Sequence, residues 1–517
     1  MSLPSKGRIG ENCRATSGRR EAMDPLFELN LQRVPKGSRD ASQSLYRQLK
    51  DAILEGRLAR GARLPPTRSS GRHFGVSRNT AAEIYDRLTS EGYLVSRPGS
   101  GTFVANHLPG SRRKSRVASS AIVPFPLNDF WLRPDVMAAM GFWQDQPDQP
   151  RRSSDVARID FRPGLVDWRH FPFEIFRRVS AKQLRGLERQ PPLNKSAQGN
   201  QGNFSLRAAI TRHIAATRAV ACLPSDLLVT SGAQQAFDLL ARTLVTAGET
   251  VVAVEDPGYP PMRAAFAAAG ARLAPVAVDA EGLIVDQLPA DTRVVSLCPS
   301  HQYPLGVTMS MARRQALIEF ATRHGAVIIE DDYDGEFRFE GNSLPALRTS
   351  ETAASVFYVG TFSKCMLPAL RLGYIVAPAW AMPTLISAKN CMDWHTATPI
   401  QAAVSKFISE GHLTRHVRAM RATYGTRRQQ LLEILRREFS DWLDPLPSFY
   451  GMHLTAIARP QVRLEAVIRK LRTSALNIHS LERYFLGIPT HHGLVFGYGA
   501  VDLGDIEQGL EALRRVL

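Results

Sequence analysis

The chain has 517 residues and a mass of 57.2 kDa, more than the roughly 100–200 residues of one ordinary domain. Apolar residues make up 44% and charged residues 22%, a balance that excludes a largely disordered chain and a membrane protein. No apolar run approaches the ~18 residues that cross a bilayer, and the basic start lacks the apolar segment of a secretory signal. We therefore predict a cytoplasmic protein with at least two folded domains.

The net charge of +17 is concentrated in the amino-terminal part. Residues 1–116 contain 22 lysines and arginines against 10 aspartates and glutamates, and so hold 12 of the 17 net charges. This concentration predicts an anionic polymer as a partner. Residues 1–40 have few apolar positions and no periodicity, and we interpret them as a mobile arm whose true start is Met1 or Met23. A basic disordered tail alone explains these residues, but not the patterned segment after them.

Residues 41–105 show the order helix, helix, helix, hairpin. Apolar side chains at helical intervals predict a first helix that ends at Gly56. A second helix is predicted over residues 66–74, and Ser77 is placed to cap a third. The following YLVSRPGSGTFVA predicts two short strands around a glycine-rich turn. This order is that of a winged helix-turn-helix domain, and the proline-rich, charged residues 106–160 are predicted to be a linker.

The third predicted helix opens with Ser-Arg-Asn-Thr at residues 77–80. Arginine pairs favourably with guanine and asparagine with adenine in the major groove, so this helix is a candidate for base recognition. Arg68 and Arg72 on the preceding helix are placed to hold phosphates. A solvated helix face is the alternative interpretation of four such residues alone.

The segment from L-Y-R-Q-L through G-V-S-R-N-T to R-P-G-S-G-T-F-V resembles the GntR family of winged-helix repressors over some 60 residues. One departure is Ser70-Gly71, where that family has an apolar pair. Glycine costs about 1 kcal/mol in a helix, so we expect the second helix to be soft. The resemblance implies DNA contacts from Arg68, Ser77, Arg78, Asn79, Thr80, Gly99 and Ser100.

Beyond residue 161, short apolar strands alternate with helical segments. Examples are LLVTSG before QQAFDLLARTLV and ARRQALIEFATRHG before AVIIEDDYD. This alternation predicts an α/β domain built around a largely parallel sheet, spanning residues 161–517.

The sequence G-T-F-S-K at residues 360–364 follows the apolar strand SVFYV. A lysine at a strand end is placed to form a Schiff base with a carbonyl cofactor, which makes Lys364 the candidate catalytic residue. Thr361, Ser363 and Arg371 supply hydroxyls and charge for a phosphate. An ordinary surface lysine is the alternative interpretation of the S-K pair alone.

The sequence E-D-D-Y at residues 330–333 follows the buried strand AVII, at a carboxyl end where ligands collect in open α/β sheets. Asp331 is placed to hold a pyridine nitrogen protonated, and Tyr333 to bond the ring hydroxyl. A solvated acidic turn or a metal site is the alternative, but no matching histidine or third carboxylate is evident. The cysteines also lack C-x-x-C spacing, so no metal site is predicted.

Two further segments complete the pattern. The turn TSGAQ at residues 230–234 leaves backbone N–H groups free for a phosphate at a helix start. The segment EDPGY at residues 255–259 places Tyr259 after a strand, where its ring can stack on a planar cofactor. A plain strand-to-helix turn and a core tyrosine are the respective alternatives.

In this order, the four segments resemble fold-type I aminotransferases over residues 160–517, a fold with a small carboxyl-terminal α+β subdomain. The resemblance implies pyridoxal 5'-phosphate as the cofactor, Lys364 as its Schiff-base partner and the same domain as the dimerisation domain. The other implied cofactor contacts are Asp331, Tyr333, Tyr259, Gly232, Ala233, Gln234, Thr361, Ser363 and Arg371.

Joined to the GntR-like domain, the chain resembles the MocR/GabR family of bacterial regulators. This implies a homodimer that binds double-stranded DNA with two half-sites, associates with the nucleoid, and senses a small amine, an amino acid or the cofactor itself. A catalytic aminotransferase with an accessory DNA-binding domain is the competing function, and a decayed cofactor pocket is a third.

Three departures from the aminotransferase pattern favour weak or absent turnover. Tyr303 stands where aminotransferases carry an asparagine. Residues 197–202 (AQGNQG) lack the tyrosine that reaches the phosphate of the partner subunit. Val495 stands where an arginine usually clamps the substrate carboxylate, and bidentate capture is then lost.

Overall fold

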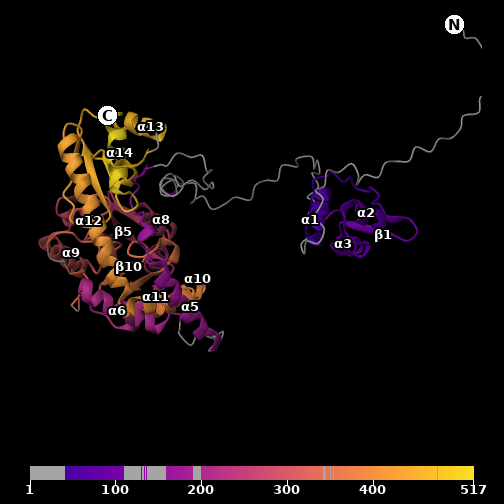
Figure 1. The fold of residues 1–517 in the computed structure, drawn as a ribbon. Helices are drawn as coiled ribbons and strands as arrows, with labels where there is room; N and C mark the ends of the chain where they lie inside the picture. Colours follow the sequence, from indigo (N-terminus) through magenta and orange to yellow (C-terminus); the bar gives the residue numbers. More distant parts are fainter. Residues whose placement is uncertain are drawn as a thin grey trace, which may run out of the picture. The chain divides into compact units, whose positions relative to one another are not determined.

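The protein is described by a computed structural model in which the chain forms two compact units, Met1–Phe125 and Pro126–Leu517 (Figure 1). The predicted arm, residues 1–40, and nearly all of the predicted linker, residues 106–160, lie outside the described residues. The structure describes residues 41–109, 130, 133, 136, 159–189, 200–341, 345–349, 351–352, 354–473 and 476–517.

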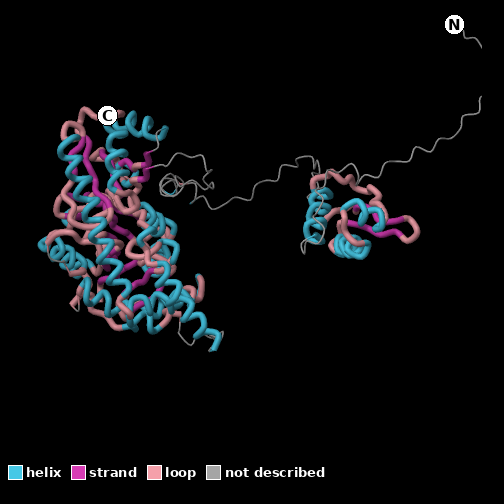
Figure 2. The backbone as a smooth tube through the Cα atoms, viewed as in Figure 1, coloured by secondary structure: helices cyan, strands magenta, loops and turns pink. Residues whose placement is uncertain are grey.

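The first unit, here called the winged unit, has the predicted order of three helices and a hairpin (Figure 2). The two strands are antiparallel, with Leu94 opposite Val104. The core extends to Leu108, which is 9% exposed and packs in the same apolar cluster. The elements are α1 (Ala41–Leu54), α2 (Thr67–Phe74), α3 (Arg78–Ser90), β1 (Leu94–Arg97) and β2 (Gly101–Val104).

The turn between α2 and α3 follows from two local signals. Gly75 ends α2 with φ +73°, a left-handed conformation that favours glycine, and its N–H donates to the Gly71 carbonyl. Ser77 then caps α3, because its hydroxyl accepts a hydrogen bond from the Thr80 N–H at 3.0 Å. The two helices are thereby held in the helix-turn-helix arrangement.

The unusual Ser70-Gly71 pair is buried inside the winged unit. A Cβ atom at Gly71 would lie 3.0 Å from the Val76 carbonyl oxygen, so the glycine allows the turn to approach α2 closely. The Ser70 hydroxyl lies 2.7 Å from the Tyr85 hydroxyl, which itself donates to the Pro65 carbonyl. A close backbone approach and a buried polar contact therefore stand where the related domains have two apolar side chains.

The second unit, here called the α/β unit, is built around an eight-stranded mixed sheet. The neighbouring pairs β5–β6, β5–β8, β8–β9 and β9–β10 are parallel, whereas β11 is antiparallel to both β10 and β4. The largely parallel sheet that the sequence predicts is confirmed. In order across the sheet, the strands are β4 (Leu227–Thr230), β11 (Gly373–Val376), β10 (Val356–Thr361), β9 (Val327–Asp332), β8 (Thr292–Leu297), β5 (Val251–Asp256), β6 (Arg272–Asp279) and β7 (Gly282–Leu283).

Helices cover both faces of this sheet. Successive residues of a strand point to opposite faces, so neighbouring residues of β5 pack against different helices. Val252 and Val254 pack in one apolar cluster with residues of α7, α8 and α10, whereas the intervening Ala253 packs in another with residues of α9. Buried residues of α6, α11 and α12 form a third cluster. The helices are α5 (Phe173–Arg189), α6 (Phe204–Arg218), α7 (Ala233–Leu244), α8 (Pro260–Ala268), α9 (Met311–His324), α10 (Met382–Met392), α11 (Thr398–Ser409) and α12 (His412–Glu438).

The carboxyl-terminal residues form the predicted small α+β subdomain, in which a four-stranded sheet has the order β12, β13, β16, β15. The strand β3 (Ile159–Asp160), from the start of the unit, pairs in parallel with β14 (Leu476–Asn477) of this subdomain. None of the described helices is long and apolar enough to span a membrane. The remaining elements are β12 (Leu443–Pro445), β13 (His453–Ala458), α13 (Leu464–Thr473), β15 (His479–Ser480), β16 (Gly493–Gly497) and α14 (Leu503–Arg514), with 3-10 turns at Trp168–His170, Pro224–Asp226, Val285–Gln287, Pro368–Leu370 and Leu481–Tyr484.

Candidate functional site

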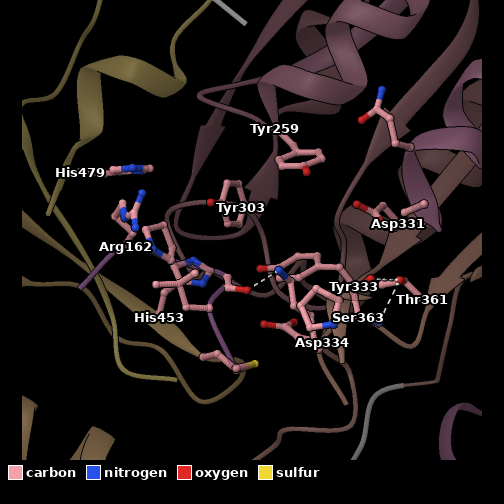
Figure 3. A pocket seen from close by; sticks show the side chains of 18 of the residues that line it. Arg162, Tyr259, Tyr303, Asp331, Tyr333, Asp334, Thr361, Ser363, His453 and His479 are labelled. Atoms are coloured by element: carbon pink, nitrogen blue, oxygen red, sulfur yellow. Dashed lines mark hydrogen bonds between the residues drawn. The ribbon is translucent and has the colours of Figure 1, made fainter. Parts of the chain in front are cut away.

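A cavity of about 520 Å³ lies in the α/β unit where β9 and β10 end and α7 begins (Figure 3). Its size is that of a small-molecule site, since such sites measure roughly 300–1,000 Å³. Ten cofactor residues were predicted, and one of them, Gly232, is not in the cavity lining but directly precedes the lining residue Ala233 in the chain. The other nine line the cavity: Ala233, Gln234, Tyr259, Asp331, Tyr333, Thr361, Ser363, Lys364 and Arg371.

Lys364 follows β10 and is half-buried. Burial lowers the pKa of its amine to about 8, although the carboxyls of Asp334 and Asp331 act in the opposite direction. The Nζ atom donates a hydrogen bond of 2.7 Å to the Gly164 carbonyl. Gly164 has φ +86°, a left-handed conformation that favours glycine, and a Cβ atom there would lie 2.7 Å from Nζ. A lysine whose pKa is lowered by burial is a stronger nucleophile near neutral pH.

Asp331, in β9, is 4% exposed. Burial raises the pKa of its carboxyl to about 8, and the neighbouring carboxyls of Asp332 and Asp334 add to the shift. Its Oδ2 atom accepts a weak bond from Cys298 Sγ at 3.8 Å, while Oδ1 is buried and has no hydrogen-bond partner among the described residues. A buried oxygen without a partner is costly. A protonated ring nitrogen would supply the missing donor and the positive charge, so Asp331 fits the cofactor that the sequence implies.

The anion end of the cavity is formed by the start of α7 and by Arg371. Gly232 precedes the helix with φ +85° and no side-chain cap, which leaves the first backbone N–H groups available. The Arg371 guanidinium packs on Gly232, where a Cβ atom would lie 2.9 Å from it, and donates to the Ser231 carbonyl at 3.1 Å. Thr361 donates its hydroxyl proton to the Ser363 hydroxyl at 3.0 Å. Backbone amides, hydroxyls and a guanidinium are the groups that hold a phosphate.

Three tyrosines surround the space between these groups. The Tyr259 and Tyr303 rings meet edge to face at 5.4 Å, and the Tyr303 and Tyr333 rings at 5.6 Å. The Tyr333 hydroxyl contacts His301 Nδ1 at 2.8 Å and donates to the His301 carbonyl at 3.1 Å. Tyr303, one of the three departures from the aminotransferase pattern, therefore lines the cavity itself.

Several cavity residues were not predicted from the sequence. Asp334 immediately follows the predicted Tyr333, so extending the acidic motif by one residue would have found it. Arg162 comes from the start of the unit, and His453 and His479 from the small subdomain, far along the chain. Figure 3 shows these three on the side opposite Asp331 and Thr361. The remaining cavity residues that were missed are Pro163, Gly164, Leu165, Pro368 and Met452.

His301, Asp334 and His453 lie close enough together to hold a metal ion. Several of their polar atoms already take part in hydrogen bonds, however. His301 Nδ1 lies 3.1 Å from both Asp334 oxygens, and His453 Nε2 lies 3.1 Å from the Pro304 carbonyl oxygen. Burial lowers the pKa of His301 to about 3, so the imidazole is neutral at physiological pH. The cluster is explained as a hydrogen-bonded wall behind Tyr333.

Besides Tyr303, the other two departures lie wholly or partly in described parts of the α/β unit. Val495 lies in the centre of β16, fully buried, directly opposite His479 in the sheet register. It packs in one apolar cluster with Tyr303 and Tyr484. Of residues 197–202, the first three lie outside the described residues. Gly202, the last, is buried, and a Cβ atom there would lie 2.7 Å from the Gln401 amide oxygen.

The predicted DNA-binding residues lie in and around α2, α3 and the hairpin turn of the winged unit. Ser77 and Thr80 contact each other at the start of α3 through their hydroxyls, 2.9 Å apart, so the Ser77 side chain serves first as the helix cap. The side chains of the two residues between them, Arg78 and Asn79, are exposed. The other exposed members of the predicted set are Arg68, Ser77, Gly99 and Ser100, and Thr80 is partly buried.

Two protein families match the chain. Residues 41–104 match the bacterial regulatory proteins of the gntR family, and residues 170–489 match aminotransferase class I and II. The second match covers most of the α/β unit, including the cavity residues from Ala233 to His479.

Solved structures show the same fold. Kynurenine aminotransferase of Pyrococcus horikoshii, at 23% identity, covers 72% of this chain and 97% of its own with a TM-score of 0.64. LysN, the α-aminoadipate aminotransferase of Thermus thermophilus, at 26% identity, covers 70% and 92% with a TM-score of 0.62. These likenesses cover the α/β unit.

Similar curated proteins cover both units. The probable rhizopine catabolism regulatory protein MocR of Rhizobium meliloti is 35% identical over 91% of this chain and 92% of its own length. The HTH-type transcriptional regulator TauR of Rhodobacter capsulatus is 34% identical over 78% and 81%. The chain therefore belongs to the MocR-type family of transcription regulators, in which a gntR-family helix-turn-helix domain precedes an aminotransferase class I and II domain.

Proposed function

We propose that this protein binds pyridoxal 5'-phosphate in the α/β unit, senses a small amine, an amino acid or the cofactor itself there, and regulates transcription through the winged unit. The observation that carries the proposal is that Lys364 and Asp331 line one cavity with the anion-holding groups of α7. An amine, a carboxyl and an anion site in one cavity are the groups that a phosphorylated pyridine aldehyde needs.

When bound, pyridoxal phosphate supplies an aldehyde carbon and an electron-accepting ring. Lys364 is the residue that would hold the cofactor at that carbon, where the bound aldehyde would supply reversible carbonyl–amine chemistry to an incoming primary amine. Asp331 would hold the proton on the ring nitrogen through the oxygen that now lacks a partner. Arg371 and the first amides of α7 would hold the phosphate, and Tyr333, fixed by His301, would lie beside the ring.

The winged unit is proposed to bind a double-stranded operator. Arg78 and Asn79 are exposed at the start of α3, the part of a recognition helix that meets base edges. Because such a regulator acts on chromosomal DNA, we place it in the cytoplasm, at the nucleoid.

A homodimer that binds two half-sites is part of the same proposal. Phe173 and Leu184 on α5 are 49% and 50% exposed, and Phe204 at the start of α6 is 62% exposed. Large apolar side chains left on one surface are typical of a subunit interface. Two identical winged units would then read two copies of one half-site.

Catalytic transamination is the competing function, because Lys364 and Asp331, the candidate Schiff-base lysine and the candidate ring-nitrogen carboxyl, line the same cavity. Val495, at the position of the expected carboxylate clamp, disfavours it. Slow or absent turnover is expected when the protein is mixed with common amino acids and a keto acid. Sustained multiple turnover would replace the regulatory proposal with the enzymatic one.

The proposal is tested by two measurements on the full chain. Pyridoxal phosphate is added to the purified protein, and a visible absorption band distinct from that of the free cofactor is expected. Binding sites are then selected from random duplex DNA, and the selected sequences are expected to contain two copies of one half-site. Absence of the band would refute cofactor binding, and absence of any enriched sequence would refute operator binding.

A further inference from the structure

The charged groups of the cavity are unevenly placed. Among the described residues that line it, the guanidinium groups belong to Arg371 and Arg162. Arg371 lies at the anion end, on Gly232. Arg162 lies on the opposite side, beside His453 and His479 (Figure 3). Arg162 is therefore the guanidinium group that an anion on a ligand would meet on this far side.

The charge of Arg162 is already compensated by Asp160, two residues earlier. Its Nε atom lies 2.8 Å and 3.1 Å from the two carboxylate oxygens of Asp160, and its terminal nitrogen lies 2.5 Å from one of them. The Asp160 carboxylate also accepts the Arg162 backbone N–H at 3.1 Å. The side chains are 15% and 13% exposed, so water screens this pair little. A second carboxylate would have to displace a bidentate partner that the chain itself supplies.

The strand β16, next to this side of the cavity, offers no second arginine that could hold a carboxylate. Val495 is directly opposite His479 in antiparallel register, and directly opposite residues project from the same face of a sheet. The valine side chain therefore points toward the same side as a cavity residue, but it has no hydrogen-bond donor. Its neighbours in the apolar cluster are Tyr303 and Tyr484.

Two further polar groups of the cavity wall, His453 and Tyr303, are uncharged, and Asp334 is a carboxyl group. Burial keeps the pKa of His453 well below its usual value, so its imidazole carries no charge. Burial likewise raises the pKa of the Tyr303 phenol. Asp334, 2% exposed and also on the cavity, adds no positive charge that could hold an anion.

From these contacts we infer that the effector is a primary amine without a carboxylate, and that its other substituents are uncharged. The inference rests on the proposed function, since it describes the ligand of that same cavity. The amine would meet the cofactor bound at Lys364, and the rest of the molecule would contact phenols, imidazoles and apolar side chains on the far side. An α-amino acid would bring a carboxylate to a surface whose one arginine is already paired.

The test compares amines with the amino acids that differ from them by the carboxylate. The pairs are 2-phenylethylamine with phenylalanine, ethanolamine with serine, and isobutylamine with valine. Each compound is titrated into the cofactor-loaded full chain, following the visible band and, separately, the heat of binding. In the pair that fits the cavity best, we expect the amine to bind about ten- to hundredfold more tightly. The inference is overturned if the amino acids bind as tightly as the amines, or if none of the amines binds.

Asp160→Asn sharpens the test, because it leaves the Arg162 guanidinium without its carboxylate. The ratio of amine affinity to amino-acid affinity is expected to fall by about tenfold or more, through tighter binding of the amino acid. Asp444→Asn, at an exposed aspartate of β12, is the matched control and should leave the ratio unchanged. An unchanged ratio in a folded Asp160→Asn protein would overturn the assignment of Arg162. The unmodified chain decides the effector class even if that variant does not fold.

If the unmodified chain gives no visible band with pyridoxal phosphate, the proposed function itself fails. If the band forms but amino acids are preferred, only the effector class is wrong.

Discussion

The winged unit and the α/β unit place their functional side chains in opposite environments. Arg68, Arg78 and Asn79 are exposed, whereas Asp331 is 4% exposed and Lys364 is half-buried, with pKa values of both moved to about 8. Exposed charges act through many small, salt-screened contacts. Buried groups act through few contacts, each of which has no substitute. Changes in the two units should therefore differ in size and in salt dependence.

The largest expected effect is that of Lys364→Ala on cofactor binding. The visible band produced by pyridoxal phosphate should disappear, because no other described lysine lines the cavity. Lys406→Ala, at an exposed lysine of α11, should keep the band. A band of unchanged position and intensity in Lys364→Ala would show that the cofactor is anchored elsewhere.

Asp331→Asn should weaken the binding of pyridoxal phosphate without removing it. The variant loses a charge-assisted hydrogen bond, which contributes roughly 1.5–3 kcal/mol, or about ten- to hundredfold in the dissociation constant. Titration of the visible band measures this constant, with Asp444→Asn as the surface control. An affinity equal to that of the unmodified protein would mean that the Asp331 oxygen without a partner does not face the ring nitrogen.

In the winged unit, Arg78→Ala and Arg72→Ala should fail in different ways. If Arg78 contacts a base, its loss should cost about 1–3 kcal/mol at the operator and blur the preference at one base pair of each half-site. If Arg72 contacts a phosphate, its loss should weaken all sequences alike and reduce the salt slope by about one. Binding is measured by fluorescence anisotropy across salt concentrations and operator variants. Unchanged affinity and preference in Arg78→Ala would refute the placement of the recognition helix.

Gly71→Ala tests whether close packing or helix propensity governs α2. Alanine has the higher helix propensity by about 1 kcal/mol, but its Cβ atom would lie 3.0 Å from a backbone oxygen of a tight turn. We expect a net loss of about 1–3 kcal/mol in the unfolding free energy of the winged unit. Gly186→Ala on α5, where the added atom meets nothing within 4 Å, should instead stabilise its own unit. Thermal unfolding of the full chain measures both, and a Gly71→Ala protein that melts higher would mean that propensity governs.

The smallest expected effect concerns the pH dependence of the winged unit. Glu91 accepts hydrogen bonds from Lys50 and Tyr46, and the first of these contributes most to lowering its pKa from 4.5 to about 2. Because the folded-state pKa is depressed, the stabilisation is present above pH of about 4.5 and is lost as the pH falls toward about 2. The difference in melting temperature between the unmodified protein and Glu91→Gln should shrink over that window. A difference that does not change with pH would indicate that the carboxylate charge is not what stabilises the unit.

Local sequence signals predicted the parts of the site that lie within one short segment. Lys364 follows β10 and Asp331 lies near the end of β9, and both positions at neighbouring strand ends follow from the apolar runs that precede them. The Ser77 cap and the Gly75 turn are likewise readable from residue type. These predictions depend only on neighbours in the chain and on the fact that parallel strands end at one edge of the sheet.

The parts that could not be predicted come from distant segments. Arg162 and His453 reach the cavity only because β3 pairs with β14 of the small subdomain, and because β13 lies at the centre of its sheet. Nothing near either residue in the sequence indicates this. The sequence shows Asp160 and Arg162 as two charged residues close together. Their effect on the choice of ligand depends on the pairing of β3 with β14, which the sequence does not indicate.

The bond from Lys364 to the Gly164 carbonyl joins residues 200 positions apart. Gly164 lies only four residues after β3, where the described part of the α/β unit begins. Whatever binds the lysine nitrogen must compete with that carbonyl. Occupancy of the cavity therefore bears directly on the backbone just after β3, because the carbonyl that now holds the lysine would have to be released or find another donor.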